Sequence, residues 1–207
     1  MYILDPSLFI GRGVNRECYR HPENSDLCIK VVVGHGGKRE NRVEQSAYRR
    51  LEKRGISWEM LSRFYGTVNT NKGPGAVFEL IRDKDGAISK PLRDYIGTPD
   101  VTALHRDGLS RAFFALKTYL IREEILTTAL KAQNMVYQRT PETDGKLVII
   151  DDIGNTDFIP ICTYLGWAAR RKINRKWAQF EHRLKTRYAH NPVLQEIISH
   201  HENGNKA

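Results

Sequence analysis

The predicted fold of this chain depends most on the stretch from Ile125 to Gly154, which reads ILTTALKAQNMVYQRTPETDGKLVIIDDIG. Two apolar runs of alternating character, Met135–Gln138 and Leu147–Ile150, flank a segment that contains Pro, Asp and Gly. Short alternating runs on either side of such turn residues predict a β-hairpin.

Polar side chains lie at the open end of this predicted hairpin. Lys131 and Asn134 come just before its first strand, and Asp151 and Asp152 come just after its second strand. Because the strands of a hairpin are antiparallel, both pairs are expected at the same end of one rigid element. An ammonium group, an amide and carboxylates held together suit a phosphate that is bridged by a metal ion.

The same residues resemble those of protein kinases. The run ILTTALKAQNMV is similar to the kinase catalytic loop, H-R-D-x-x-x-x-N, with Asn134 at the metal-binding Asn and Lys131 two residues after the base. The run DDIG resembles the kinase D-F-G motif. Ala129 stands where kinases carry the base Asp, and Thr127 and Thr128 replace the His and the Arg.

This pattern resembles the YrbL family, small bacterial kinase-like proteins tied to the PhoP regulatory network. That family carries a similar S-L-K-P-Q-N loop without the Asp, followed by D-x-I-G, and the resemblance extends from Leu8 to Trp177. It implies an α+β, two-lobed protein-kinase-like fold. The N-lobe, residues 1–80, would hold an antiparallel sheet and one helix, and residues 81–207 would form a reduced, mainly helical C-lobe. For this stretch alone, the alternative is an ordinary hairpin with polar surface residues.

Three β-rich runs are predicted within residues 8–33, separated by the turn-rich segments GRGVNR and HPENSD. Gly11 and Gly13 match the first two glycines of the kinase G-x-G-x-x-G-x-V loop, whereas Arg16 replaces the third glycine and Cys18 replaces the Val. Glycines here would let backbone N–H groups approach phosphates without a Cβ clash. A plain hairpin turn is the alternative. A Rossmann motif is excluded because a strand, rather than a helix, follows the loop.

Lys30 lies within the apolar run CIKVV, where an ammonium group is costly unless it has an anionic partner. The resemblance gives Lys30 the role of the V-A-I-K lysine, which contacts the α- and β-phosphates of ATP and pairs with a helix glutamate. The helix predicted before Gly55 places Glu44 on its apolar face, so Glu44 is the expected partner and Glu40 the fallback. The alternative is an edge-strand lysine that points to solvent.

Two further runs, FYGTVNT and GAVFELIRD, complete a predicted sheet of about five strands. By resemblance, backbone groups of Phe78, Glu79 and Leu80 would hydrogen-bond an adenine ring. The polar segment IRDKDGAISKPLRDYIGTPD is expected to be a connection. Ser110 is expected to cap the helix that follows, and this helix would lead to the organising hairpin.

Composition places the chain among globular proteins. Its 207 residues are 40% hydrophobic and 28% charged, which suits one large or two-lobed domain. No apolar run approaches the roughly 20 residues of a membrane helix, and MYILDPSLF lacks the features of a signal peptide. Cys18, Cys28 and Cys162 lack metal-ligand spacing and fit free thiols in the cytoplasm, the expected location. The polar tail from His200 onward is expected to be disordered.

The net charge of +9 is concentrated in the segment Gly166–His190, which carries eight basic residues and one Glu. The basic residues are Arg170, Arg171, Lys172, Arg175, Lys176, Arg183, Lys185 and Arg187. Apolar residues recur at steps of three and four in this segment and predict a long helix with an apolar stripe. The basic faces are either a solvated surface or a binding surface for an anionic partner, nucleic acid or acidic lipid headgroups.

The order of these features favours a protein that binds ATP and Mg²⁺ and is related to phosphotransferases. Asn134 and Asp152 would hold the metal, with Asp151 as the alternative because the family's D-x-I-G pattern favours it. Lys131 would neutralise the transferred phosphoryl group, and Asp151 could act as a substitute base. Lys30 would contact the phosphates of the same nucleotide in a cleft between the lobes.

Two other classes of function stay open at this point. Ala129 cannot accept a proton, so the chain could be a pseudokinase that binds nucleotide, or nothing, and acts as a regulatory module. Alternatively, the basic helix could make the chain a nucleic-acid- or acidic-lipid-binding domain. The acceptor substrate is not indicated, and no A-P-E segment for a protein substrate is present.

Overall fold

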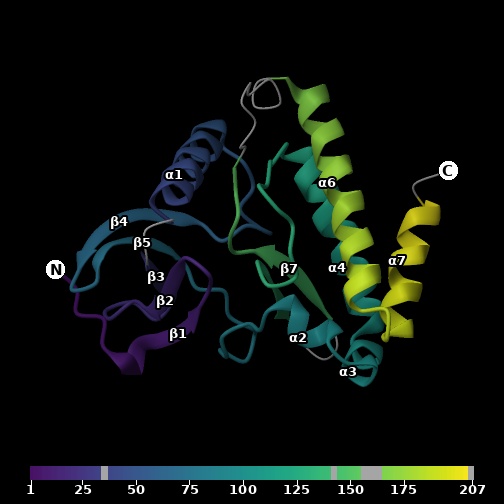
Figure 1. Cartoon of the computed structure of the whole chain (residues 1–207), viewed down its shortest axis with the longest axis horizontal. Coiled ribbons are helices and arrows are strands. Elements are labelled where there is room, and N and C mark those ends of the chain that lie inside the picture. Colours follow the sequence, from purple (N-terminus) through teal and green to yellow (C-terminus); the bar gives the residue numbers. More distant parts are fainter. Residues whose placement is uncertain (34–36, 141–143, 155–164, 205–207) are drawn as a thin grey trace. The chain divides into compact units, whose positions relative to one another are not determined.

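The computed structural model describes residues 1–33, 37–140, 144–154 and 165–204, which form two compact units (Figure 1). The first unit comprises Met1–Trp58 and Ser62–Ile81, and the second comprises Glu59–Leu61 and Arg82–Ala207. Cys162, the tip of the predicted hairpin and the side chain of Glu40 lie outside the described residues.

An antiparallel sheet of five strands forms the body of the first unit, in the order β1-β2-β3-β5-β4. The strands are β1 Phe9–Arg12, β2 Arg16–Arg20, β3 Leu27–Val32, β4 Phe64–Thr70 and β5 Gly73–Glu79. Together with the helices of both units, this sheet confirms the predicted α+β class.

The two faces of this sheet are covered by different parts of the unit. On one face, the ring of Tyr48 from α1 (Gly37–Arg54) lies 5.3 Å from the Phe78 ring and 5.8 Å from the Phe64 ring. The helix ends at Gly55, whose φ of 65° is a left-handed conformation that glycine adopts without steric cost. The other face carries a buried apolar cluster of Leu4, Tyr19, Ile29, Val31 and Val77.

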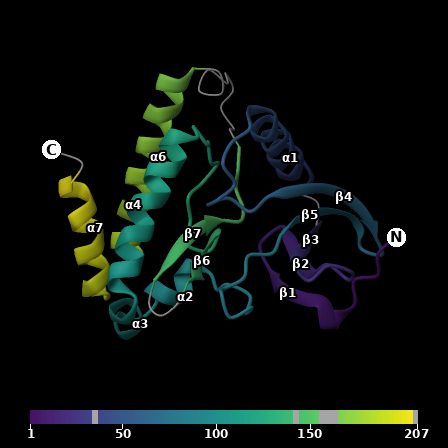
Figure 2. The same cartoon turned by 180° about the vertical axis from the view of Figure 1, so that it is seen from behind.

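Helices dominate the second unit. They are α2 Leu92–Ile96, α3 Pro99–Leu104, α4 Arg106–Arg122, α6 Gly166–Arg187 and α7 Pro192–Gly204. The organising hairpin is present as β6 (Met135–Arg139) paired with β7 (Gly145–Ile149). The long helices α4, α6 and α7 lie side by side in both views, and β7 packs against α4 (Figures 1 and 2).

Three segments of the second unit differ from the sequence-based expectation. The expected connection contains α2 and α3, because Leu92 and Ile96 are fully buried and anchor a short helix. Helix α4 begins at Arg106, so Ser110 lies inside the helix instead of capping it. Helix α7 continues past His200 to Gly204, because buried apolar residues in its first half give it a packed face. No helix in the described part of the chain is both long and apolar enough to cross a bilayer.

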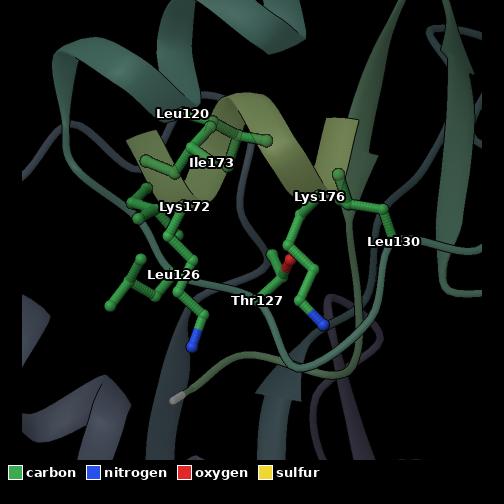
Figure 3. Close-up of a pocket in the computed structure, with 8 residues that line it drawn as sticks. Leu120, Leu126, Thr127, Leu130, Lys172, Ile173 and Lys176 are labelled. Carbon is green, nitrogen blue, oxygen red and sulfur yellow. The ribbon is translucent and has the colours of Figure 1, made fainter. Parts of the chain in front are cut away.

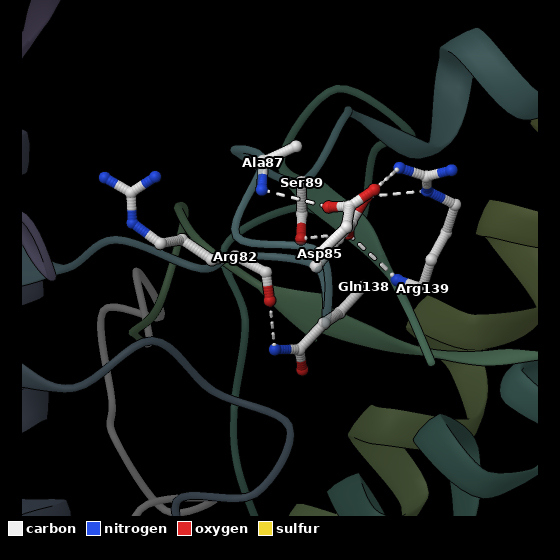
Figure 4. Close-up of polar contacts among 7 residues, drawn as sticks. Arg82, Asp85, Ala87, Ser89, Gln138 and Arg139 are labelled. Carbon is white, nitrogen blue, oxygen red and sulfur yellow. Dashed lines mark hydrogen bonds and ion pairs between the residues drawn. The ribbon is translucent and has the colours of Figure 1, made fainter. Parts of the chain in front are cut away.

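An ion-pair network joins β6 to the segment that precedes α2 (Figure 4). Nε of Arg139 donates to the Asp83 carboxylate at 2.6 Å, and its backbone N–H donates to the same group at 2.9 Å. Asp83 also accepts from the Ser89 hydroxyl, and a second nitrogen of Arg139 contacts Asp85 at 2.9 Å. The Asp83 side chain is 2% exposed, so these hydrogen bonds offset the cost of burying its charge.

Candidate functional site

The loop before β6 is fastened to the segment after β7 by backbone hydrogen bonds. The N–H of Thr128 donates to the carbonyl of Asp152 at 2.8 Å, and the N–H of Gly154 donates to the carbonyl of Leu126 at 2.9 Å. The N–H of Ile150 donates to the carbonyl of Asn134 at 3.0 Å. These bonds hold the polar residues before β6 next to the polar residues after β7, as the sequence predicted.

Three polar side chains meet at this end of the hairpin. Nδ2 of Asn134 donates to Oδ2 of Asp152 at 2.5 Å, and Nζ of Lys131 lies 3.4 Å from the same oxygen. Asp151 instead turns its Oδ1 back to accept from the N–H of Asp152 at 2.7 Å. Of the two adjacent aspartates, Asp152 is therefore the one whose carboxylate meets Asn134 and Lys131.

The backbone of Asp152 is strained. Its φ is 64°, a left-handed conformation that a non-glycine residue adopts at a cost of about 1–3 kcal/mol. Such strain persists only where neighbouring contacts hold it, and here the bonds to Thr128 and Asp151 do so. Strained residues cluster at functional sites, so this conformation marks Asp152 as a functional candidate.

The chemistry of this cluster suits a hard cation that is shared with a phosphate. The side chain of Asp152 is 29% exposed and that of Lys131 is 49% exposed, so a ligand can reach both. Mg²⁺ is commonly bound through one or two carboxylates together with phosphate oxygens, rather than by an all-protein cage. The described residues contain no group of three or more His, Cys, Asp or Glu side chains that could form such a cage.

Two basic side chains of α6 hydrogen-bond to carbonyl groups of the loop before β6. Nζ of Lys176 donates to the carbonyl of Thr128 at 2.8 Å, and Nη2 of Arg183 donates to the carbonyl of Leu130 at 2.7 Å. Figure 3 shows Lys172 and Lys176 reaching from α6 along Thr127 toward the loop. The recess that these side chains line with neighbouring leucines is filled too tightly to hold a ligand.

The supporting role of Lys176 and Arg183 was missed in the sequence, where they appear only as part of a basic run. The signal was their spacing of seven residues, which places both on one side of a helix. That spacing alone does not identify the carbonyl groups that they contact.

In the first unit, one face of the sheet carries Lys30, the side chain expected to contact phosphates. Cys18 on β2 lies opposite Lys30 on β3, and Arg16 lies opposite Val32, so Arg16, Cys18 and Lys30 share this face. Lys30 is buried, with its Nζ 4.5 Å from the centre of the Phe78 ring. Cys18, like Cys28 beside Lys30, is a free thiol.

Glu44 also reaches this face, but its hydrogen bond goes to a residue that the sequence did not suggest. Nη1 of Arg16 donates to Oε2 of Glu44, and Oε1 of Glu44 has no hydrogen-bond partner among the described residues. Burial lowers the pKa of Lys30, Arg16 lowers it further, and Glu44 opposes both effects. Glu44 therefore influences Lys30 through its charge while Arg16 holds its carboxylate. The expected pairing of Glu44 with Lys30 stays a prediction.

Two of the backbone N–H groups expected to hydrogen-bond an adenine ring are occupied within the first unit. The N–H of Glu79 donates to the carbonyl of Arg63, and the N–H of Leu80 donates to that of Asp26, each at 2.8 Å. Phe78 is fully buried in β5 and serves the core. The N–H groups of Glu79 and Leu80 already have partners within the unit, so an adenine at this segment would have to use other backbone groups.

Gly11 lies in β1, and Gly13 lies in the turn that joins β1 to β2. The N–H of Gly13 donates to the carbonyl of Arg16 at 2.8 Å and closes the turn between β1 and β2. A Cβ at Gly11 would meet no atom within 4 Å. Packing within the unit therefore does not require glycine at position 11, and the space over it is open to a ligand.

The chain has a kinase-like fold. The crystal structure of the PF14_0431 kinase domain is similar to this chain with a TM-score of 0.51 at 16% sequence identity, over 75% of this chain. The chain spans 54% of that kinase chain, about half of its length. At this identity the similarity concerns the fold alone.

The chain belongs to the family of the PhoP regulatory network protein YrbL, whose family model matches residues 3–185. The uncharacterized protein YrbL of Escherichia coli (strain K12) is 36% identical to it over 175 residues, which cover 83% of this chain and 82% of the relative. The YrbL protein of Shigella flexneri matches with the same values. The predicted family is thereby confirmed.

Proposed function

We propose that this protein binds ATP together with Mg²⁺ and acts as a phosphotransferase-related member of its PhoP-linked family. The observation that carries the proposal is the cluster at the hairpin end, where the strained Asp152 meets Asn134 and Lys131. The family and the kinase-like fold support the same assignment. We also propose a cytoplasmic location, with which an ATP-dependent role agrees.

Each residue of the cluster has a distinct task in this proposal. Oxygens of Asn134 and Asp152 would hold Mg²⁺, which when bound neutralises charge on the phosphate oxygens. Lys131 would stabilise the negative charge on the phosphoryl group in transit. Lys30, in the first unit, would contact the α- and β-phosphates of the same nucleotide.

The absence of a loop base limits the rate in this proposal but does not prevent transfer. General acid–base catalysis contributes about 10²–10⁴-fold in rate, and Ala129 cannot supply it. Phosphoryl transfer through a loose transition state depends mainly on positioning and charge stabilisation. The hydroxyl proton of the acceptor would pass to Asp151, whose Oδ1 accepts from the backbone of Asp152, or to solvent. We therefore expect slow turnover.

A pseudokinase is the second candidate, and a specific observation favours it. In the described structure Arg16, rather than Lys30, donates the hydrogen bond to Glu44. If Arg16 keeps the Glu44 carboxylate when nucleotide is present, Glu44 does not take the role that kinases give to the helix glutamate. The protein would then bind nucleotide and signal through its bound state.

The first test is a thermal-shift titration of the full chain with ATP and Mg²⁺. Ligand that binds the folded state raises the melting temperature, so the wild type should be stabilised. Asp152→Asn should lose the Mg²⁺-dependent part of that shift, whereas Asp107→Asn, at an exposed position on α4, should keep it. Absence of stabilisation in the wild type would contradict the proposal.

A second measurement separates the enzyme from the pseudokinase. After incubation with ATP and Mg²⁺, intact-mass spectrometry and assays of ADP release should detect phosphorylated protein or slow ATP turnover. Stabilisation by ATP without either product would leave the pseudokinase as the function. In that case Asp152→Asn would still weaken binding.

A further inference from the structure

At least four of the eight basic residues of helix α6 are buried or bonded inside its own unit. Lys176 and Arg183 donate to carbonyl groups of the loop, and Arg170 lies 3.4 Å from the Glu124 carboxylate. Lys172 is buried. These four cations are engaged, so the charge available to an outside partner is smaller than the sequence suggests.

Two of the remaining arginines form a compact exposed surface with apolar neighbours. Arg171 and Arg175 are exposed and make no hydrogen bond or ion pair with the residues that the structure describes. They lie one helical turn apart, and Trp167 lies one turn before Arg171, so the three share a stripe. Trp167 is 66% exposed, and Leu165 just before it is 45% exposed. An exposed tryptophan and leucine therefore adjoin two unpaired cations.

We infer that this surface, made of Leu165, Trp167, Arg171 and Arg175, docks on an anionic lipid bilayer. Tryptophan has an apolar body and a polar N–H, which suits the boundary between headgroups and acyl chains. Arginines beside it attract acidic headgroups at the membrane surface. This docking is independent of the proposed nucleotide site.

A lipid surface fits these side chains better than nucleic acid does. Tryptophan and arginine can both stack on bases, but an exposed leucine neither stacks nor hydrogen-bonds with them. At a bilayer, Leu165 instead adds apolar area that leaves water. Because Leu165 and Trp167 lie together at one end of the cationic stripe, the surface favours a lipid bilayer over nucleic acid.

Flotation of the full chain with vesicles tests the inference. Vesicles of phosphatidylcholine mixed with phosphatidylglycerol should carry the protein, and pure phosphatidylcholine vesicles should not. Each arginine near an anionic surface contributes about five-fold to partitioning, so Arg171→Gln/Arg175→Gln should lose about twenty-five-fold. The matched control is Arg49→Gln/Arg50→Gln on exposed positions of α1, which removes the same charge and should bind normally.

Tryptophan fluorescence adds a measurement that reports contact directly. Trp177 is buried and Trp58 stacks on Tyr48, so a blue shift on adding anionic vesicles should come from Trp167. The shift should be absent in Trp167→Phe. Equal flotation of the arginine variant and its control would overturn the inference. So would tighter binding of the wild type to a labelled RNA or DNA oligonucleotide that depends on Arg171 and Arg175, which would assign the surface to nucleic acid.

Discussion

A single buried carboxylate lies between two cations in the first unit. The side chain of Glu44 is 5% exposed, and it accepts from Arg16 while its charge counteracts the lowering of the pKa of Lys30. Removing water from charged groups costs several kcal/mol per ion unless geometry compensates. The balance between the charges of these three side chains therefore affects both the stability of the unit and the pKa of Lys30.

Arg16→Ala should remove the cation that shares the Glu44 carboxylate and lowers the pKa of Lys30. Because the charged form of Lys30 is then favoured, we expect Mg·ATP to bind about ten-fold more tightly, a change of ~1.4 kcal/mol, as measured by isothermal titration calorimetry. The control is Arg12→Ala, an exposed arginine of the same hairpin that pairs with Glu17 at 3.5 Å. Weaker binding by Arg16→Ala would instead mean that Arg16 itself contacts the nucleotide.

Lys30→Met should stabilise the fold while it removes nucleotide binding. The lowered pKa of Lys30 means that the folded state disfavours its charged form, so an apolar side chain of similar length should raise the melting temperature by a few degrees. The gain should be fully present at neutral pH and should vanish as the pH rises above the ordinary lysine value of 10.5, where the wild-type lysine is neutral in both states. A melting temperature below that of the wild type would contradict this interpretation.

At the scale of elements, α6 positions the loop that carries Lys131 and Asn134. Because Lys176 and Arg183 hold the loop through carbonyl groups, Lys176→Met/Arg183→Met should loosen it without unfolding the helix. Hydrogen bonds to charged groups contribute about 1.5–3 kcal/mol, so Mg·ATP affinity should fall at least about ten-fold. Arg187→Met, an exposed residue near the end of α6, should leave the affinity unchanged. Normal affinity in the double variant would show that the loop is held by its backbone bonds alone.

The network between β6 and the segment before α2 makes a separate prediction about stability. Arg139→Ala leaves the buried Asp83 with an uncompensated charge and should lower the free energy of unfolding by about 3 kcal/mol in urea denaturation. Arg93→Ala removes an exposed partner of Asp94 and should cost less than about 1 kcal/mol. Similar losses in the two variants would mean that the network does not stabilise the fold.

The elements that the sequence predicted well are those encoded locally. The strands of the organising hairpin follow from alternation and turn residues, and the polar residues that flank them meet because the strands are antiparallel. The contacts that were not predicted join distant segments. Arg16 and Glu44 are 28 residues apart, and Lys176 and Thr128 are 48 apart. Such pairings are decided by tertiary packing, and neither periodicity nor a motif identifies the two partners.

At the scale of the whole molecule, the proposed function depends on residues of both units. Lys30 belongs to the first unit, and Asn134 and Asp152 belong to the second. In the proposal, one nucleotide contacts all three side chains. The binding energies of single variants test whether these side chains act on the same ligand.

The most direct measurement is calorimetric titration of Mg·ATP into the full chain and into Lys30→Ala and Asp152→Asn. The wild type should bind one nucleotide, and each variant should weaken binding at least about ten-fold, a loss of ~1.4 kcal/mol. Absence of binding by the wild type, or normal affinity in either variant, would contradict a nucleotide site that both units share.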